Sequence, residues 1–472
     1  MYASRAMEDF FPAWSWKPLS ADGSAPDITK AGCGQIALPH YQNVDSFMFT
    51  LGVTLPWYAE QYAHLRDECN WRMPSVPQVA AYTNEELEMR DMVATDVTSY
   101  WKEKQNMSLL DIRPYDREYY ETTIRPFLPK KIIDCHAHIW LDRFVTGEDH
   151  KLRSCLWPML VAKDNSIEDL CETNRLLFPD NEVISVLYSH TNVAVDLSQS
   201  NPYVLRCAQE YGFPALYVAH PKMPAEEVER EVLAHPAWKG VKVYLEYAPA
   251  YIPNNEIRIY DFLTPEHLAL ADKHGWIVQL HIARPKRLAD PVNYHQLLEI
   301  EQNYPNLQLW VAHLGRAYAN EDVGDALEFL KNTEKTMWDF TANTNDWVME
   351  QVLSRFGAER FIYGSDFPIF RMKARRVVEN GFYINEIPKN SLGSFSVDYY
   401  KTNSEAGAGS VLSDPHLREI EGPEAEKITF FIYEEIAACR RACERLGLGK
   451  AEVEKIFYGN CAKLFGLPAQ EE

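Results

Sequence analysis

Two histidines in one short apolar stretch are the clearest candidates for chemistry in this sequence. His136 and His138 lie within residues 131–140, where isoleucines precede them and an isoleucine and a tryptophan follow, as in a buried strand. Because successive side chains of a strand point to opposite faces, the two imidazoles project from one face, about 7 Å apart along the backbone. Neutral imidazoles in this arrangement can hold one metal ion, and they suit zinc and related divalent ions. Two unrelated histidines would show the same spacing, so downstream residues must decide.

Three further polar residues stand at the ends of other apolar runs. His281, His313 and Asp366 each follow a run rich in β-branched and aromatic residues. Each of them alone is most often a packed rim residue or a cap. If the runs are parallel strands of one barrel, however, their carboxyl ends share one face and these side chains converge there. Four such strand ends are hard to explain as coincidence, so we interpret the set as a candidate active site.

The elements that must position these residues form a regular rhythm from residue 131 onwards. Short runs typical of strands alternate with helical patterns, and the runs begin near Lys131, Glu182, Pro214, Gly240, Trp276, Leu307, Thr336 and Arg360. Residues 264–284 show the unit most clearly, because Thr264 suits a helix N-cap, Gly275 suits the helix end, and a continuous apolar run follows. Eight such units over roughly 250 residues predict an α/β fold, a (β/α)8 TIM barrel. An open doubly wound sheet is the alternative, although no glycine-rich phosphate fingerprint follows the first run.

Two segments fall outside this rhythm. Residues 1–130 are rich in aromatic residues interrupted by prolines, and a capping box at Thr83 and Glu86 predicts one helix there. We expect an aromatic-rich helical N-terminal extension that packs on the barrel. Residues 385–422 are rich in glycine, serine and asparagine without periodicity, which predicts an irregular insertion or lid after the eighth strand. Helices over residues 423–446 and 450–465 would then complete a barrel domain spanning residues 131–468.

Composition narrows the choice of partners. The formal charge of -21 over 472 residues argues against nucleic acid or an anionic membrane as the partner. Nine irregularly spaced cysteines fit a reducing compartment better than a disulfide scaffold. We find neither a signal peptide nor a run of roughly 18 apolar residues that could span a bilayer. We therefore expect a soluble, cytoplasmic protein whose partner is a small-molecule substrate.

The motifs resemble those of the amidohydrolase superfamily. The resemblance rests on Cys135-His136-Ala137-His138 in the first expected strand, the single histidines of the fifth and sixth, and Gly364-Ser365-Asp366-Phe367-Pro368 at the eighth. The nearer match is the amidohydrolase-related branch that includes the aminocarboxymuconate-semialdehyde decarboxylase-like enzymes. Residues 457–467 are similar to the usual C-terminal helix of that branch. The resemblance covers about residues 131–384 and 425–468.

This resemblance implies a distorted barrel with one divalent metal ion, usually Zn²⁺, and many members of the branch form homodimers. His136, His138, His281 and Asp366 match the ligand positions, and His313 matches a histidine outside the ligand set that orients the substrate and transfers a proton. Asp366 is then expected to act as the general base toward a metal-activated water. His313 would stabilise the oxyanion or protonate the leaving group.

Lys242, in the fourth expected strand, bears on the number of metal ions. In binuclear relatives a carboxylated lysine bridges two metals at this position, so a second metal with carboxylated Lys242 is the alternative to the single ion that we expect. Arg284 and Arg316 follow the histidines of the fifth and sixth strands, and either could hold a substrate carboxylate in a bidentate fork. A surface ion pair is the plainer interpretation of each. The remaining candidates for the pocket wall or for support of the ligands are Trp140, His190, His220 and Asp339.

Two reactions fit this set of residues. The first is hydrolysis, in which metal-activated water attacks a C–N or C–O bond of a small carboxylated or cyclic substrate. The alternative is non-oxidative decarboxylation of an aromatic or unsaturated acid, with His313 serving protonation of the carbon. A third hypothesis is an inactive barrel that serves as a binding module.

Overall fold

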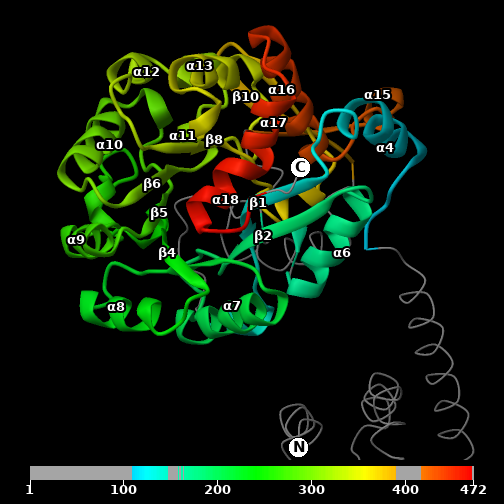
Figure 1. The fold of residues 1–472 in the computed structure, drawn as a ribbon. Helices are drawn as coiled ribbons and strands as arrows, with labels where there is room; N and C mark the ends of the chain where they lie inside the picture. Colours follow the sequence, from blue (N-terminus) through cyan, green and yellow to red (C-terminus); the bar gives the residue numbers. More distant parts are fainter. Residues whose placement is uncertain (1–108, 147–157, 159–160, 163, 390–415, 470–472) are drawn as a thin grey trace, which may run out of the picture. The chain divides into compact units, whose positions relative to one another are not determined.

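The apolar runs of the sequence fold into a ring of eight parallel strands in a computed structural model, which describes residues 109–146, 158, 161–162, 164–389 and 416–469. The strands follow one another around the ring in chain order, each hydrogen-bonded to the next (Figure 1). They are β1 (Lys131–His138), β2 (Glu182–Tyr188), β3 (Ala215–Val218), β4 (Trp238–Val243), β5 (Ile277–Leu280), β6 (Gln308–Val311), β7 (Met337–Asp339) and β8 (Phe361–Ile362).

The ring closes between its first and last strands. Cys135 N donates to Tyr363 O at 3.0 Å, and His138 N donates to Phe367 O at 3.2 Å. The (β/α)8 barrel predicted from the sequence is therefore confirmed, and the open doubly wound sheet is excluded. Each strand begins within two residues of its predicted start. The starts could be predicted because a strand covered on both faces is continuously apolar, and such a run is easy to locate in a sequence.

Helices cover the outside of this ring (Figure 1). The longer ones are α6 (Ile167–Leu177), α7 (Leu197–Tyr211), α8 (Ala225–Leu233), α9 (Pro265–His274), α10 (Pro291–Asn303), α13 (Asp346–Phe356) and α16 (Phe431–Leu446). The caps expected for α9 are present. Thr264 accepts a hydrogen bond from His267 N, and Gly275 has the left-handed φ of 65° that ends a helix without steric cost.

The chain after β8 differs from its predicted course. The helix expected over residues 423–446 is divided into α15 (Pro423–Glu426) and α16, because residues between them turn to bond another segment: Ala374 N donates to Thr429 O at 3.2 Å. The segment expected over residues 450–465 is helical throughout, as α17 (Lys450–Glu454), a π-helical turn (Lys455–Gly459) and α18 (Asn460–Phe465).

A second sheet stands beside the barrel, formed by β9 (Arg375–Glu379), β10 (Phe382–Pro388) and β11 (Leu417–Ile420). The two ends of the insertion predicted to be irregular, residues 385–422, are therefore strands, and its residues 390–415 lie outside the described residues. The search for continuous apolar runs did not find these strands, because they carry charged residues that form ion pairs with another strand of the sheet. Arg375 lies 2.7 Å from Glu386, and Arg418 lies 2.8 Å from Glu379.

Residues 109–130 pack against the barrel through a short helix, α4 (Pro114–Tyr119), and the π-helical turn Tyr120–Ile124. Tyr119 stacks on Tyr433 of α16 with ring centroids 6.5 Å apart, and Phe127 meets Phe457 edge-on at 5.6 Å. The rest of the expected extension, including the helix predicted near Thr83, lies outside the described residues. Among the described helices, none is both long and apolar enough to cross a membrane.

Candidate functional site

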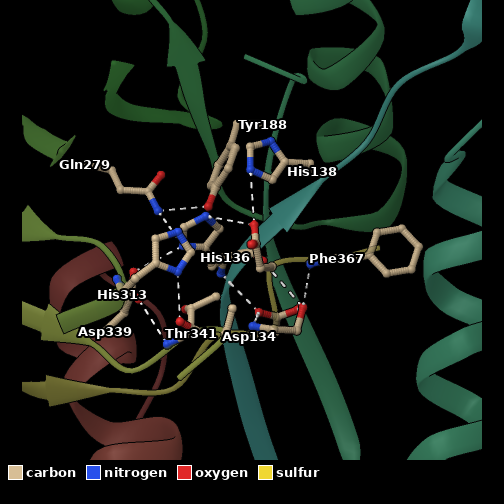
Figure 2. A network of polar contacts seen from close by, with 12 residues as sticks. Asp134, His136, His138, Tyr188, Gln279, His313, Asp339, Thr341 and Phe367 are labelled. Atoms are coloured by element: carbon tan, nitrogen blue, oxygen red, sulfur yellow. Dashed lines mark hydrogen bonds and ion pairs between the residues drawn. The ribbon is translucent and has the colours of Figure 1, made fainter. Parts of the chain in front are cut away.

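The end of β1 is fixed to the segment that follows β8 by a single carboxylate. Asp134 accepts hydrogen bonds from His136 N at 3.0 Å, from Ser365 N at 2.8 Å and from Ser365 Oγ at 2.6 Å (Figure 2). Burial raises the pKa of Asp134 to about 6, and the bonds from Ser365 and His136 oppose that rise. Because Ser365 precedes Asp366, this contact sets the position of Asp366 relative to His136.

Asp366 faces both histidines of β1. Its Oδ1 lies 3.4 Å from His136 Nε2 and 3.6 Å from His138 Nε2. Two nitrogen or oxygen ligands of a tetrahedral zinc ion, each about 2.1 Å from the metal, are about 3.4 Å apart. His136 Nε2 is buried and has no hydrogen-bond partner among the described residues. The Asp366 carboxylate therefore lies at ligand spacing from each histidine, and imidazole and carboxylate are donors that a divalent metal ion accepts.

The partners of three histidines fix which ring nitrogen is free. His136 Nδ1 lies 3.1 Å from Asp339 Oδ2, His138 Nδ1 lies 2.9 Å from Ser189 O, and His313 Nδ1 lies 2.8 Å from Thr341 O. Ser189 O and Thr341 O can only accept, so Nδ1 of His138 and of His313 carries the proton and donates it, and each Nε2 keeps its lone pair. His136 Nδ1 lies between the Asp339 carboxylate and the Gln279 amide nitrogen at 2.9 Å, and the carboxylate favours the same tautomer there. Metal-ligating histidines are commonly held in this way.

Burial keeps these rings neutral. It lowers the pKa of His136 and His138 well below the ordinary value, and lowers that of His313 to about 4. Burial also lowers the pKa of His281 well below its ordinary value, and His281 Nδ1 has no hydrogen-bond partner among the described residues. Neutral imidazole is the form that binds a cation, so the electrostatic environment agrees with the donor geometry.

The five predicted residues lie at one end of the barrel. The ring of His313 is 4.8 Å from that of His136 and 4.4 Å from that of His281, centroid to centroid. The donor atoms of His136, His313 and Asp366 lie within 4.8 Å of one another, which makes these three a group able to hold a metal ion. His313, predicted to lie outside the ligand set, therefore belongs to this group, whereas the predicted ligands His138 and His281 do not.

Gln279, which the sequence did not single out, and Asp339, which it did, both lie beside His136. The side-chain nitrogen of Gln279 lies 2.9 Å from both His136 Nδ1 and the Tyr188 hydroxyl. Asp339, expected to support a ligand, contacts His136 and also accepts from Trp310 Nε1 and from the backbone N–H of His313, both at 2.7 Å. One signal in the sequence could have identified Gln279, because it is the only amide inside its apolar run. A buried polar group needs a hydrogen-bond partner, so such a residue is expected to contact another polar group.

Lys242 points into the same region. Its Nζ is buried without a hydrogen-bond partner among the described residues and lies 4.9 Å from the centre of the Tyr188 ring. Burial lowers the pKa of Lys242 to about 8, against the opposing charges of Asp366 and Asp339. Burial raises the pKa of Asp366 to about 7, and here the charge of Lys242 opposes the rise.

A cavity of about 670 Å³ opens onto this group. His138, His281, His313 and Asp366 line it, and so do Arg316 and His190 among the further candidates. The other candidates, which include Lys242 and Asp339, are not among its lining residues. Arg284 donates to Ile257 O at 3.0 Å, His220 packs on Tyr247 with ring centroids 4.8 Å apart, and Trp140 is buried against His190. Of the two arginines predicted to meet a substrate, the structure therefore brings only Arg316 to the cavity.

Comparison with known proteins gives one family and several solved structures. A family model described as amidohydrolase matches residues 133–379, slightly more than half of the chain. No curated protein matches. A probable 2-pyrone-4,6-dicarboxylic acid hydrolase from Acinetobacter baumannii, solved with citric acid, is 17% identical over 71% of this chain and 99% of its own, with a TM-score of 0.42.

Two decarboxylase structures are also similar. The 5-carboxyvanillate decarboxylase from Sphingomonas paucimobilis is 9% identical over 72% of this chain and 100% of its own, with a TM-score of 0.43. A dihydroxybenzoic acid decarboxylase from Polaromonas sp. JS666, solved with manganese and 2-nitroresorcinol, is 12% identical over 72% of this chain and 98% of its own, with a TM-score of 0.39.

Proposed function

Because the chain belongs to the amidohydrolase family and is thus an enzyme, we propose that it is a metal-dependent hydrolase that cleaves a C–N or C–O bond of a small carboxylated or cyclic substrate. One observation carries this proposal. The Asp366 carboxylate lies 3.4 and 3.6 Å from the Nε2 atoms of His136 and His138, and it lines a cavity large enough for a small molecule.

We assign His136, His138, His281 and Asp366 as the residues that would hold one Zn²⁺ ion. Three neutral imidazoles and one carboxylate are donors that zinc accepts, and such a set leaves room for a further ligand. When bound, the ion supplies Lewis acidity, which polarises a substrate carbonyl and acidifies water. We keep Lys242 outside the ligand set, as an unmodified amine beside the Tyr188 ring.

The proton transfers are assigned to Asp366 and His313. Asp366 lines the cavity, and we assign its carboxylate as the base that accepts the proton of the attacking water. The hydrogen bond from His313 Nδ1 to Thr341 O fixes the ring, so Nε2 is the atom left for the substrate. There it can take up a proton and return it to the leaving nitrogen or oxygen, or donate to the developing oxyanion.

The alternative reaction is non-oxidative decarboxylation of an aromatic or unsaturated acid. Arg316 favours it, because this arginine lines the cavity and its guanidinium has no carboxylate partner among the described residues. An acid whose carboxylate binds Arg316 would place its carbon skeleton near His313, which lies three residues earlier in the chain and lines the same cavity. The same histidine would then protonate carbon instead of nitrogen or oxygen.

One assay separates the two reactions. The zinc-loaded protein is incubated with lactones, amides and aromatic carboxylic acids, while acid release and CO₂ release are measured together. Acid release without CO₂ is expected, and CO₂ release would select the decarboxylase. Metal analysis of protein purified without added zinc should give one divalent ion per chain. A folded protein that takes up no divalent metal and turns over no substrate would instead support the binding-module hypothesis.

A further inference from the structure

The cavity wall carries an excess of positive charge, although the whole chain has a formal charge of -21. Of the described residues that line the cavity, Asp366 is the only carboxylate, whereas Arg287, Arg316 and Arg376 are all arginines. A protein with so many acidic residues could have neutralised each of these cations. The partners of the three arginines show that it neutralises only one.

Arg287 is the neutralised cation, because its Nη1 lies 2.7 and 2.8 Å from the two carboxylate oxygens of Asp322. Arg376 has neutral acceptors instead: its Nε donates to Asn385 Oδ1 at 2.9 Å and its Nη1 donates to Ala342 O at 2.6 Å. These bonds hold the guanidinium in place, but no carboxylate among the described residues forms an ion pair with it, and the charge of Glu435 acts on it only from beyond ion-pair distance. Its Nη2 has no hydrogen-bond partner among the described residues.

Arg376 does not lie beside the catalytic residues in the chain or on the barrel. It belongs to β9 of the second sheet, whereas Arg316 ends the short turn that begins with His313. The Arg376 guanidinium lies 4.3 Å from the ring centre of Tyr318 and 4.9 Å from that of Tyr383, and both rings also line the cavity. Aromatic faces attract a cation but leave its outer N–H groups free for an anion.

We propose that Arg376, held by Asn385 and Ala342 and flanked by Tyr318 and Tyr383, binds a second carboxylate of the substrate. A partly buried guanidinium has lost part of its hydration, and an anionic ligand can replace the lost interactions with water. The planar fork of N–H groups also matches the two oxygens of a carboxylate. The barrel then supplies the reacting groups, and β9 selects substrates that carry a negative charge remote from the reacting bond. We call this part of the second sheet, with Arg376 at its centre, the specificity wall. The inference rests on the proposed function, because it takes this cavity as the substrate site.

Binding of simple acids to the metal-loaded full chain tests the subsite. Benzoate, benzene-1,3-dicarboxylate, benzene-1,4-dicarboxylate and 3-carbamoylbenzoate are titrated in a calorimeter. One of the dicarboxylates should bind about tenfold tighter than benzoate, as one charge-assisted hydrogen-bonded contact predicts. The neutral amide should bind like benzoate. Equal binding of the mono- and dicarboxylates to the wild-type protein would overturn the subsite without any variant.

Arg376→Met should remove the dicarboxylate advantage and leave benzoate binding unchanged. Arg418→Met is the matched control, because Arg418 belongs to the same sheet, pairs with Glu379 at 2.8 Å and does not line the cavity. It should retain the full advantage. If Arg376→Met does not unfold cooperatively, Arg376→Lys replaces it and should lose most of the advantage, because an ammonium lacks the planar fork.

Three outcomes would contradict the assignment in distinguishable ways. An Arg376 variant that weakens benzoate and dicarboxylates equally would show a structural role only. A preference for 3-phosphonobenzoate over both dicarboxylates, abolished in the same variant, would assign the subsite to phosphate. A wild-type protein that binds no metal and none of the acids would overturn the proposed function together with the subsite.

Discussion

At the scale of single residues, the similar settings of His136 and His313 raise the question of what separates their roles. Both rings are buried, both donate from Nδ1, and both leave Nε2 free. The difference lies in the acceptor, because His136 donates to the carboxylate of Asp339 whereas His313 donates to the neutral carbonyl of Thr341. A carboxylate partner raises the basicity of an imidazole and so strengthens a metal ligand.

This difference predicts separate effects of two variants. His136→Asn should lose most of the bound metal, whereas His313→Asn should keep one ion per chain and lose about 10²- to 10⁴-fold in turnover, the usual contribution of a general acid or base. Metal analysis of both purified variants, followed by steady-state kinetics, makes the comparison. If His313→Asn loses its metal too, His313 is a ligand, as the spacing of His136, His313 and Asp366 would permit.

Arg284 and Arg316 show where prediction from single residues reaches its limit. Each follows a candidate histidine by three residues, so the sequence offered no reason to separate them. Arg284 donates hydrogen bonds to the carbonyls of Glu256 and Ile257, on a loop distant in the chain. Arg316, in contrast, lines the cavity. The histidines and Asp366 were easier to find, because a polar residue at the end of a buried strand already needs an explanation.

At the scale of elements, continuous apolar runs located the eight barrel strands, but they could not reveal the second sheet. The strands β9 and β10 mix charged and apolar residues over a short length without a regular pattern, and their ion pairs become visible only when the strands are paired. Arg376, the residue on which the specificity wall depends, lies in that sheet. The missed strands therefore also concealed a candidate binding residue.

The contact between β1 and the segment that follows β8 leads to a prediction at the scale of elements. Ser365→Ala removes the hydroxyl that donates to Asp134 at 2.6 Å and accepts from Phe367 N at 3.1 Å. Leaving these buried groups unpaired should lower the free energy of unfolding by about 1–3 kcal/mol. Metal affinity should fall as well, because Asp366 follows directly. Denaturant titration and competition with a metal chelator measure the two quantities.

Ser198→Ala is the control for that experiment, since it removes a hydroxyl that donates to Asp196 at 2.6 Å in an exposed setting at the start of α7. It should leave metal affinity unchanged. If Ser365→Ala loses stability but binds metal as tightly as the wild type, the contact stabilises the barrel without positioning Asp366.

At the scale of the whole molecule, a buried ionic cluster connects residues 109–130 to the chain after β8. Asp116 of α4 lies 2.9 Å from Lys373 Nζ and 3.3 Å from Arg113 Nε, and it accepts from Thr429 Oγ1 at 3.0 Å. Asp116 is fully buried, and Lys373 is 8% exposed. Burial raises the pKa of Asp116, but the bonds from Arg113 and Lys373 outweigh it and hold the pKa below 3.8.

The sign of the resulting pH dependence follows from that lowered pKa. Asp116 binds a proton less readily in the folded than in the unfolded chain, so its contribution to stability is complete above the unfolded pKa. The contribution is lost as the pH falls through the lower folded value. Asp116→Asn should therefore cost about 3–5 kcal/mol at pH 7, as expected when one member of a buried pair is removed. The deficit relative to the wild type should shrink below about pH 4.

Denaturant unfolding of the wild type, Asp116→Asn and Glu182→Gln between pH 3 and pH 8 measures this dependence. Glu182 pairs with Lys131 at 3.0 Å on the surface, so its variant should unfold like the wild type across the range. A deficit in Asp116→Asn that stays constant down to pH 3 would mean that its cost comes from packing, since a charge effect must vanish once the wild-type carboxyl is protonated. A deficit that disappears on acidification would identify this cluster as the ionic link between α4 and the segment after β8.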